Sequence, residues 1–375
     1  MQRILHVVNI MDRGGVETML MNVYRQIDRS KMQFDFLTHP FYRSYSQEYE
    51  DEITKMGGIV YKAPRFIKNP GEYYQYIQQV YDSQPYHIVH GHSLETSSVV
   101  YMREAKKRGM YLIAHAHSTG DNGSFARRSA VQLAHKMLRQ YPDCFFGCSE
   151  EALRYHFGKK IAASDKTSIF YNGIDLSKYQ VDDTEHRLEK ESLYRTNTSP
   201  VFGTVGRLSN EKNQLFLLGV FAEILKKEPA SILSIIGKGG LEDTLRSRAN
   251  DLGIESHVRF EGSVSNVPTF LKAFDVFLFP SIYEGLGMAG VEAQAAGLPT
   301  LMSTNVPSLA HATDLAQSLP LEAGTEAWAN KAIEMLKSNS GQRKDRTELI
   351  KAAGFDIKEI ASRLSAFYDA HGGTQ

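Results

Sequence analysis

The sequence has few cysteines, no excess of charge of either sign and no long apolar run. Lys and Arg together number 43, and so do Asp and Glu, so the chain of 375 residues carries no net charge that would attract a polyanion. Its apolar runs are shorter than the ~18 residues that a membrane-spanning helix needs. We therefore expect no nucleic-acid partner and no transmembrane segment.

Disulfides and secretion are not indicated either. Cys144 and Cys148 would lie about 13 Å apart on one face of a strand, whereas a disulfide needs Cα atoms within about 7 Å. The opening MQRILHVVNIMDRGG has a short apolar run that enters a glycine loop, without the pattern of a signal-peptide cleavage site. These features favour a reducing, cytoplasmic location.

Two familiar nucleotide-binding motifs are missing. The loop RGGVET lacks the G-x-G-x-x-G spacing of a dinucleotide fingerprint, which counts against a nicotinamide enzyme. The segment IIGKGGLEDTL lacks the G-x-x-x-x-G-K-[ST] spacing of a P-loop.

What the chain does contain is an alternation of strand and helix patterns, which is typical of parallel sheets covered on both faces. The expected strands are 3–9, 34–39, 58–62, 87–92, 111–117, 144–149, 201–208, 231–237, 258–262, 276–280 and 299–303. The polar stretch 181–200, which allows for one short helix, interrupts the alternation. We predict an α/β protein with two doubly wound, Rossmann-like domains, 1–176 and 201–355, a linker 177–200 and a final helix 356–375.

Ligands of such sheets bind beyond the carboxyl ends of the strands, and glycines and histidines occur there in the first half. Gly14 and Gly15 follow the first strand, where they either form a tight turn or leave backbone amides free for an anion. Two H-x-H pairs end later strands, His90 with His92 and His115 with His117. They could be metal ligands, but core histidines are the expectation for His90 and His115. His117, last before a loop, is a candidate for contact with substrate.

Charged residues occupy the strand ends of the second half. Arg207 and Lys212 flank a strand-to-helix loop and could hold a diphosphate without a metal; the alternative is two solvated surface charges. Glu284 lies in a loop after a buried strand, and Glu292 lies on the helix predicted to start near Met288. Gly287 lets backbone amides approach a ligand. Carboxylates suit sugar hydroxyls, and helix N-termini suit diphosphates.

In this order, the segments RGGVET, HIVHGH, HAHST, CSEEAL, YNGIDLSKY, VGRLSNEKN, IIGKGG and PSIYEGLGMAGVEAQAAGLP resemble the retaining glycosyltransferases of family 4, which have the GT-B fold. Glu284 and Glu292 match the E-x7-E signature of that family. The resemblance covers nearly the whole chain and is greatest to bacterial members that build exopolysaccharide and other surface glycans.

The resemblance implies a role for each candidate residue. Glu284 would contact hydroxyls of the donor sugar, and Glu292 the ribose. The diphosphate would be bound by Arg207 and Lys212, with backbone amides of Gly14, Gly15, Gly287 and Met288. His117 would lie beside the reacting sugar and the acceptor. The first domain would be the acceptor side, the second would bind the nucleotide sugar, and the final helix would cross back onto the first.

The implied function is retaining transfer, without metal or cofactor, of a hexosyl or N-acetylhexosaminyl unit. The donor would be a nucleotide diphosphate sugar, in particular a UDP-sugar, and the acceptor a glycan or a lipid-linked glycan in polysaccharide biosynthesis. A nucleotide-sugar epimerase of the same fold is the alternative. A non-catalytic sugar-nucleotide-binding protein and a metal-dependent hydrolase are the further hypotheses, the last resting on the H-x-H pairs alone.

A basic segment raises the question of membrane contact. Between Arg103 and Arg139 there are eight Lys or Arg and two acids. Within it, FARRSAVQLAHKMLRQY has an apolar stripe and a set of basic residues on other faces. The stripe is Phe125, Val131, Ala134 and Leu138, and the basic residues are Arg127, Arg128, Lys136 and Arg139. Such a helix either binds the anionic inner face of a membrane as a peripheral element or packs on the core with a solvated basic face.

Overall fold

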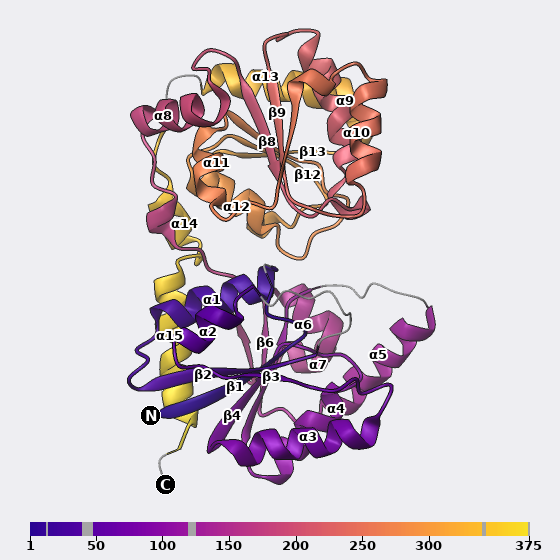
Figure 1. Cartoon of the computed structure of the whole chain (residues 1–375), viewed down its shortest axis with the longest axis vertical. Helices are drawn as coiled ribbons and strands as arrows, with labels where there is room; N and C mark the ends of the chain where they lie inside the picture. The colour runs from indigo at the N-terminus through magenta and orange to yellow at the C-terminus, as the bar shows by residue number, and fades with distance from the viewer. Residues whose placement is uncertain (13, 40–47, 119–124, 340–342, 374–375) are drawn as a thin grey trace. The chain divides into compact units, whose positions relative to one another are not determined.

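The computed structural model describes residues 1–12, 14–39, 48–118, 125–339 and 343–373. They form two compact units, which are described separately (Figure 1). Unit 1 comprises Met1–Ile174 and Gly354–Gln375, and unit 2 comprises Asp175–Ala353.

Unit 1 alternates strands with helices along most of its length. Its strands are β1 (Gln2–Val8), β2 (Met32–Thr38), β3 (Val60–Lys62), β4 (Tyr86–Gly91), β5 (Tyr111–Ala116), β6 (Cys144–Gly147) and β7 (Thr167–Ile169). Its helices are α1 (Gly15–Gln26), α2 (Glu50–Lys55), α3 (Pro70–Ser83), α4 (Ser98–Lys107), α5 (Phe125–Leu138), α6 (Glu150–Phe157), α7 (Lys159–Ala162) and α15 (Ile357–His371).

The strands of unit 1 form one parallel sheet in the order β3-β2-β1-β4-β5-β6-β7. Successive β1 side chains enter opposite cores, because strand residues alternate between faces. Leu5 packs in the core that includes α3 and α4, whereas Ile4 packs in the core with α1 and α15. The two cysteines are buried and free, one in each core.

Unit 2 has the same construction. Its strands are β8 (Val201–Val205), β9 (Ile232–Ile236), β10 (Val258–Gly262), β11 (Val276–Phe279), β12 (Thr300–Ser303) and β13 (Ala316–Leu319). Its α-helices are α8 (Asp183–Tyr194), α9 (Gln214–Leu225), α10 (Glu242–Asp251), α11 (Val267–Ala273), α12 (Met288–Ala295), α13 (Gly324–Ser338) and α14 (Thr347–Ala352). The sheet is parallel in the order β10-β9-β8-β11-β12-β13, with helices on both faces (Figure 1).

Every strand expected from the sequence is present, so the two doubly wound α/β domains are confirmed. The sequence pattern missed β7 and β13, which are short edge strands of the sequences TSI and AQSL. Neither sequence contains a run of apolar residues, so the apolar pattern that predicted the other strands does not predict these two.

The stretch 177–200, for which the sequence predicts a linker, lies within unit 2 and contains α8. Asp182 caps α8 by accepting hydrogen bonds from two backbone amides, as an N-cap aspartate should. The helix packs against α11, and its buried Lys190 forms an ion pair of 2.7 Å with Asp275. This segment is therefore anchored on the body of the unit.

The final helix, α15, belongs to unit 1. Its entry is tied to the chain near Ile174, whose backbone amide donates to Phe355 O at 2.8 Å and whose carbonyl accepts from Ile357 N at 3.0 Å. The helix packs beside α1, and its Tyr368 is fully buried. Within the described ranges no helix is both long and apolar enough to cross a membrane.

Candidate active site

Both sheets reverse their strand order at a defined point. In unit 1 the reversal lies between β1 and β4, and in unit 2 it lies between β8 and β11. In doubly wound sheets the ligand binds at this point, outside the carboxyl ends of the strands, because the two exit loops diverge there. The loops after β1, β4, β8 and β11 therefore define where the candidate site residues should lie.

In unit 2 the two exit loops are bonded to each other. Ile282 N donates to Glu211 O at 2.8 Å, and Asn213 Nδ2 donates to Pro280 O at 3.2 Å. Ser303 Oγ, at the end of β12, donates to Ser281 O at 2.5 Å. The loop that carries Lys212 is thus held against the loop that carries Glu284.

Lys212 and Glu284 form an ion pair at this junction. Their Nζ and Oε1 atoms are 2.5 Å apart, and Ser281 Oγ donates to the same carboxylate oxygen at 2.6 Å. The ammonium lies 5.1 Å from the centre of the Phe279 ring. The Glu284 side chain is only 9% exposed and that of Lys212 24%, so the pair is shielded from water on most sides. The fixed cation could bind a phosphate, and the fixed carboxylate beside it could bind the hydroxyls of a sugar attached to that phosphate.

Arg207 lies in the same loop as Lys212 and is exposed. Its carbonyl accepts a hydrogen bond of 2.9 Å from Gln214 Nε2, which fixes the backbone of the loop. The next exit loop packs directly on it: Gly237 has a φ of +137°, and a Cβ there would lie 2.0 Å from Gly206 O. Only glycine permits this approach.

The N-terminus of α12 is formed by the segment that links Glu284 to Glu292. Gly287 is its N-cap residue with a φ of +82°, and a Cβ there would lie 2.8 Å from Val306 Cγ1. Helix α12 starts at Met288, as the sequence predicts. Its first backbone amides point along the helix axis toward its positive end, where an anion is stabilised.

Glu292 lies on α12 and has a partner that the sequence did not suggest. Tyr179 Oη donates to Glu292 Oε1 at 3.1 Å, from a residue 113 positions away in the chain. Burial raises the pKa of Glu292 to about 7, and the Tyr179 hydrogen bond opposes that rise only partly. A carboxylate kept in such surroundings is destabilising by itself, which is typical of a residue retained for ligand binding.

The backbone conformation at positions 14 and 15 does not demand glycine. Gly14 is the N-cap of α1 with an ordinary φ of −97°, and Gly15 is not in the left-handed region. A Cβ on Gly15 would meet no atom within 4 Å. Gly14 N donates to Asp12 O at 2.9 Å, which fits a tight turn, so both the turn and a contact of these backbone amides with a ligand stay predictions.

The H-x-H histidines are hydrogen-bonded to one another, and His90 and His115 are buried. His90 Nδ1 lies 2.6 Å from Tyr368 Oη, and His90 Nε2 lies 3.2 Å from His115 Nδ1. Burial lowers the pKa of both rings, so both are neutral. The prediction that His90 and His115 are core histidines is confirmed.

His117 follows β5 and differs from that pair. Its Nε2 lies 2.8 Å from His92 Nδ1, and its Nδ1, which is inaccessible to water, has no hydrogen-bond partner in the part of the chain that the structure describes. Burial lowers the pKa of His117 to about 3, so the ring is neutral. This unpaired nitrogen lies just after β5, at the carboxyl end of the sheet.

Two groups of three histidines are close enough to suggest a metal site: His6, His90 and His92, and His92, His115 and His117. Two imidazole nitrogens bound to one tetrahedral zinc ion, each at about 2.0–2.1 Å, would be roughly 3.3 Å apart. The contacts of His92 with His6 and His117 are 3.0 and 2.8 Å, the lengths of hydrogen bonds. The geometry therefore favours imidazole–imidazole hydrogen bonds over metal coordination.

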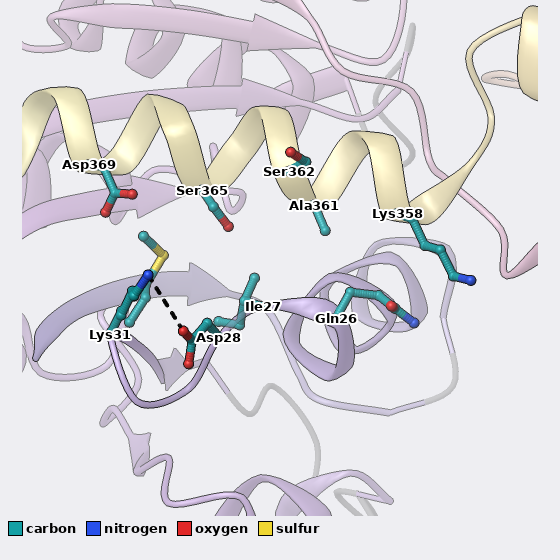
Figure 2. Close-up of a pocket in the computed structure, with 10 residues that line it drawn as sticks. Gln26, Ile27, Asp28, Lys31, Lys358, Ala361, Ser362, Ser365 and Asp369 are labelled. Atoms are coloured by element: carbon teal, nitrogen blue, oxygen red, sulfur yellow. Dashed lines mark ion pairs between the residues drawn. The ribbon is translucent and has the colours of Figure 1, made fainter.

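A cavity of about 330 Å³ lies elsewhere in unit 1, between α15 and the turn before β2 (Figure 2). Lys31 and Asp28, 3.8 Å apart, line it together with Ser362, Ser365 and Asp369 of α15. This turn lies at the amino ends of the strands, the edge of the sheet opposite to the ligand-binding edge. The cavity is therefore separate from the candidate site.

The structure brings the candidate residues into two groups. In unit 2, Lys212 contacts Glu284, and Arg207, Gly287, Met288 and Glu292 lie on the same exit loops and the helix that follows. In unit 1, Gly14, Gly15 and His117 lie at the carboxyl ends of β1 and β5. Sequence reasoning missed Tyr179, Ser281 and the bond from His92 to His117, because each contact joins residues whose proximity depends on the fold.

Two family models match the chain. The model of glycosyltransferase family 4 matches residues 13–178, and that of the group 1 glycosyl transferases matches residues 186–354. The chain therefore consists of a glycosyltransferase family 4 domain followed by a group 1 glycosyl transferase domain. The glycosyltransferase is 28% identical to EpsF of Bacillus subtilis over 98% of its own length and 96% of that protein.

A second relative is the UDP-Gal:alpha-D-GlcNAc-diphosphoundecaprenol alpha-1,3-galactosyltransferase of Escherichia coli, which is 30% identical over 59% of this chain and 58% of that protein. Among solved structures, Anabaena HepE in complex with UDP-glucose superposes with a TM-score of 0.78 at 17% identity, covering 99% of this chain and 100% of that one. The glycosyltransferase therefore has the GT-B fold.

Proposed function

We propose that this glycosyltransferase moves a hexosyl or N-acetylhexosaminyl unit from a UDP-sugar to a glycan or lipid-linked glycan acceptor in polysaccharide biosynthesis, with retention of configuration. The observation that carries the proposal is the Lys212–Glu284 pair, 2.5 Å apart beside the N-terminus of α12. The pair sets a cation that can bind phosphate next to a carboxylate that can bind hydroxyls. The donor has the matching order, with its diphosphate bonded to a sugar that carries hydroxyls.

Arg207 and Lys212 bind the diphosphate in this proposal, with backbone amides of Gly14, Gly15, Gly287 and Met288. The leaving diphosphate gains negative charge in the transition state, and fixed cations stabilise that charge without a metal ion. Glu284 holds hydroxyls of the donor sugar. Glu292, oriented by Tyr179, accepts hydrogen bonds from the ribose hydroxyls.

His117 contributes a neutral ring nitrogen beside the reacting sugar. Because burial keeps its pKa near 3, the ring acts as a hydrogen-bond partner and is too weak a base to take a proton from the acceptor hydroxyl. Retention of configuration rests on the family resemblance: an α-linked donor should give an α-linked product.

The donors and acceptors of similar proteins support the proposal. The E. coli relative uses UDP-galactose and a lipid-linked acceptor, and HepE is seen with UDP-glucose. The direct test measures thermal stabilisation by a panel of nucleotide sugars, since a bound ligand adds RT ln(1 + [L]/Kd) to stability. Transfer to lipid-linked acceptors is then followed by proton NMR of the product. A β-linked product from an α-linked donor would contradict retention.

Incubation of the enzyme with a nucleotide sugar distinguishes a transferase from an epimerase of the same fold. Without acceptor, an epimerase converts the nucleotide sugar to its stereoisomer, whereas a transferase hydrolyses it at most slowly. Accumulation of the stereoisomer would overturn the proposal.

We keep the proposal of membrane contact through α5, but the residues that would touch the membrane differ from those predicted from the sequence. Val131, Ala134 and Leu138, predicted as a lipid-binding stripe, are buried in the core, so that part of the hypothesis is wrong; the Phe125 and Arg127 side chains lie outside the described residues. The same helix exposes Leu133 by 59% and Met137 by 46%, one turn apart. We propose that this pair, beside the exposed Arg128 and Lys136, rests on the anionic inner face of the membrane.

A further inference from the structure

Three imidazoles of unit 1 form a continuous hydrogen-bonded chain that the proposed reaction does not by itself require. His6 lies on β1, His92 follows β4 and His117 follows β5. The His6 Nδ1 to His92 Nε2 distance is 3.0 Å, and the His92 Nδ1 to His117 Nε2 distance is 2.8 Å. The plane of the middle ring is tilted by 21° and 29° from those of its neighbours, and the ring centres are 5.3 and 5.1 Å away, as expected for rings joined edge to edge by hydrogen bonds.

The number of protons in this chain is fixed. Burial lowers the pKa of all three rings, and to about 3 for His6 and His117, so each ring is neutral and carries one N–H. Three protons are therefore shared among six nitrogens. Two of these protons lie within the two hydrogen bonds, and the third must sit at one end of the chain.

Only two proton arrangements keep both hydrogen bonds. In one, all three rings are protonated at Nδ1, and His117 presents an N–H donor at its free nitrogen. In the other, all three are protonated at Nε2, and His117 presents a lone pair. Any mixed set brings two lone pairs or two N–H groups face to face and loses a buried hydrogen bond, which costs about 1–3 kcal/mol.

The two ends of the chain differ in their surroundings. His6 Nε2 is buried in the core near Phe34 and Phe36 and has no partner among the described residues. His117 Nδ1 is the other unpaired nitrogen, at the carboxyl end of β5. By contrast, buried His39 has partners for both nitrogens, Val8 O at 3.0 Å and Tyr73 Oη at 2.8 Å.

We propose that His92 and His6 are positioning residues for His117, which hold its ring and lock its tautomer, so that His117 Nδ1 keeps one hydrogen-bonding character. The inference rests on the proposed function, in which His117 Nδ1 meets a sugar hydroxyl. A hydroxyl can donate or accept, so the chain decides in which direction its proton points. The arrangement does not reverse while both ends stay buried, because reversal would need one proton to leave His117 Nδ1 and another to reach His6 Nε2 in the core.

The first test reads tautomers in the wild-type protein, independently of activity. In a sample labelled with ¹⁵N at histidine, ring nitrogen shifts distinguish protonated from unprotonated nitrogens, and resonances are assigned with single His variants. The expected result is that His6, His92 and His117 carry their proton on the same-named nitrogen, with and without UDP-sugar. A mixed set in the folded protein would overturn the proposal.

The second test separates positioning from packing. His92→Phe keeps an aromatic ring but removes the bond to His117, and kcat/KM should fall about 10- to 100-fold, mainly through kcat. His92→Asn keeps a polar atom near the place of Nδ1, and should recover most of that loss. His39→Phe is the matched control: it removes a buried histidine outside the chain and should lower thermal stability with kcat/KM within about twofold.

The outcomes are distinguishable from failure of the proposed function. Inactivity of the wild type with every nucleotide sugar would count against glycosyl transfer as proposed, while the NMR result would still decide whether the chain exists. If the wild type is active and His92→Phe is folded with unchanged kinetics, His92 does not position His117 and the inference is wrong.

Discussion

Unit 1 and unit 2 reverse their strand order at the same place, between the first and the fourth strand of each sheet, yet they carry different chemistry there. Of the candidate residues, those of unit 1 are two glycines and a neutral imidazole, whereas those of unit 2 include Arg207, Lys212, Glu284 and Glu292. One architecture thus carries uncharged candidate groups in one unit and charged ones in the other. In the proposed function the cations bind the diphosphate and the carboxylates bind hydroxyls of the donor, while the imidazole contacts the reacting sugar.

The largest expected effect tests the charged side of this comparison. Arg207→Ala should lower kcat by a factor of roughly 10²–10³, because the cation stabilises charge that develops on the leaving diphosphate. Rates are measured at saturating donor, with and without EDTA. Arg248→Ala, an exposed arginine on α10, is the control and should leave kcat unchanged. Activity that depends strictly on Mg²⁺ or Mn²⁺ would contradict the metal-free role of Arg207.

Substitutions of Glu284 and Glu292 should change different kinetic constants. Glu284→Gln should mainly lower kcat, because Glu284 lies nearer the reacting sugar. Glu292→Gln should mainly raise the KM for the donor, about tenfold, because ribose contacts are similar in the ground and transition states and a hydrogen bond to a charged group contributes about 1.5–3 kcal/mol. Glu334→Gln, on the exposed face of α13, serves as control. Normal kinetics in both site variants would make the E-x7-E pattern structural.

Glu292 should also make the free enzyme less stable at high pH. Its folded pKa, about 7, is above its usual value of 4.5, so ionisation in the folded state costs free energy. This cost is absent below about pH 4.5, grows between pH 4.5 and 7, and is complete above 7. Glu292→Gln should therefore be more stable than the wild type at pH 8, by about 1–3 kcal/mol, and equally stable near pH 4.5.

Urea denaturation at the two pH values measures this difference. The same titration should lower the wild-type KM for the donor as the pH rises through about 7, because the carboxylate is the better acceptor for ribose hydroxyls. Glu292→Gln should show no such change. A variant that is less stable than the wild type at pH 8 would show that Glu292 stabilises the fold, contrary to its proposed role.

The smallest expected effect concerns the outer surface of unit 1. Leu133→Ser with Met137→Ser should reduce flotation with anionic vesicles about tenfold at low salt, since partial entry of the two apolar side chains into the interface together contributes about 1–2 kcal/mol. Leu188→Ser, an equally exposed leucine on α8 of unit 2, is the matched control. Wild-type protein that ignores such vesicles at low ionic strength would exclude membrane contact through this helix.

The sequence by itself determined the kind of fold and the kinds of chemistry. Runs such as VFLFP and HIVHGH are apolar over the length of one strand, so burial on both faces of a parallel sheet follows from local pattern alone. The spacing of Glu284 and Glu292 is also local: a loop and one helical turn separate them, so a site with two carboxylates could be inferred without tertiary information.

Only the tertiary structure decided which groups touch. Lys212 reaches Glu284 across 72 positions, because the order of strands places their loops side by side. Tyr179, which follows the 3-10 helix Leu176–Lys178 outside the sheet, reaches Glu292 across 113 positions. The histidine chain likewise depends on β1, β4 and β5 being neighbours in the sheet. Strand order is set by packing of the whole sheet and its helices, a cooperative property that no short pattern of residues contains, so these contacts could not be read from the sequence.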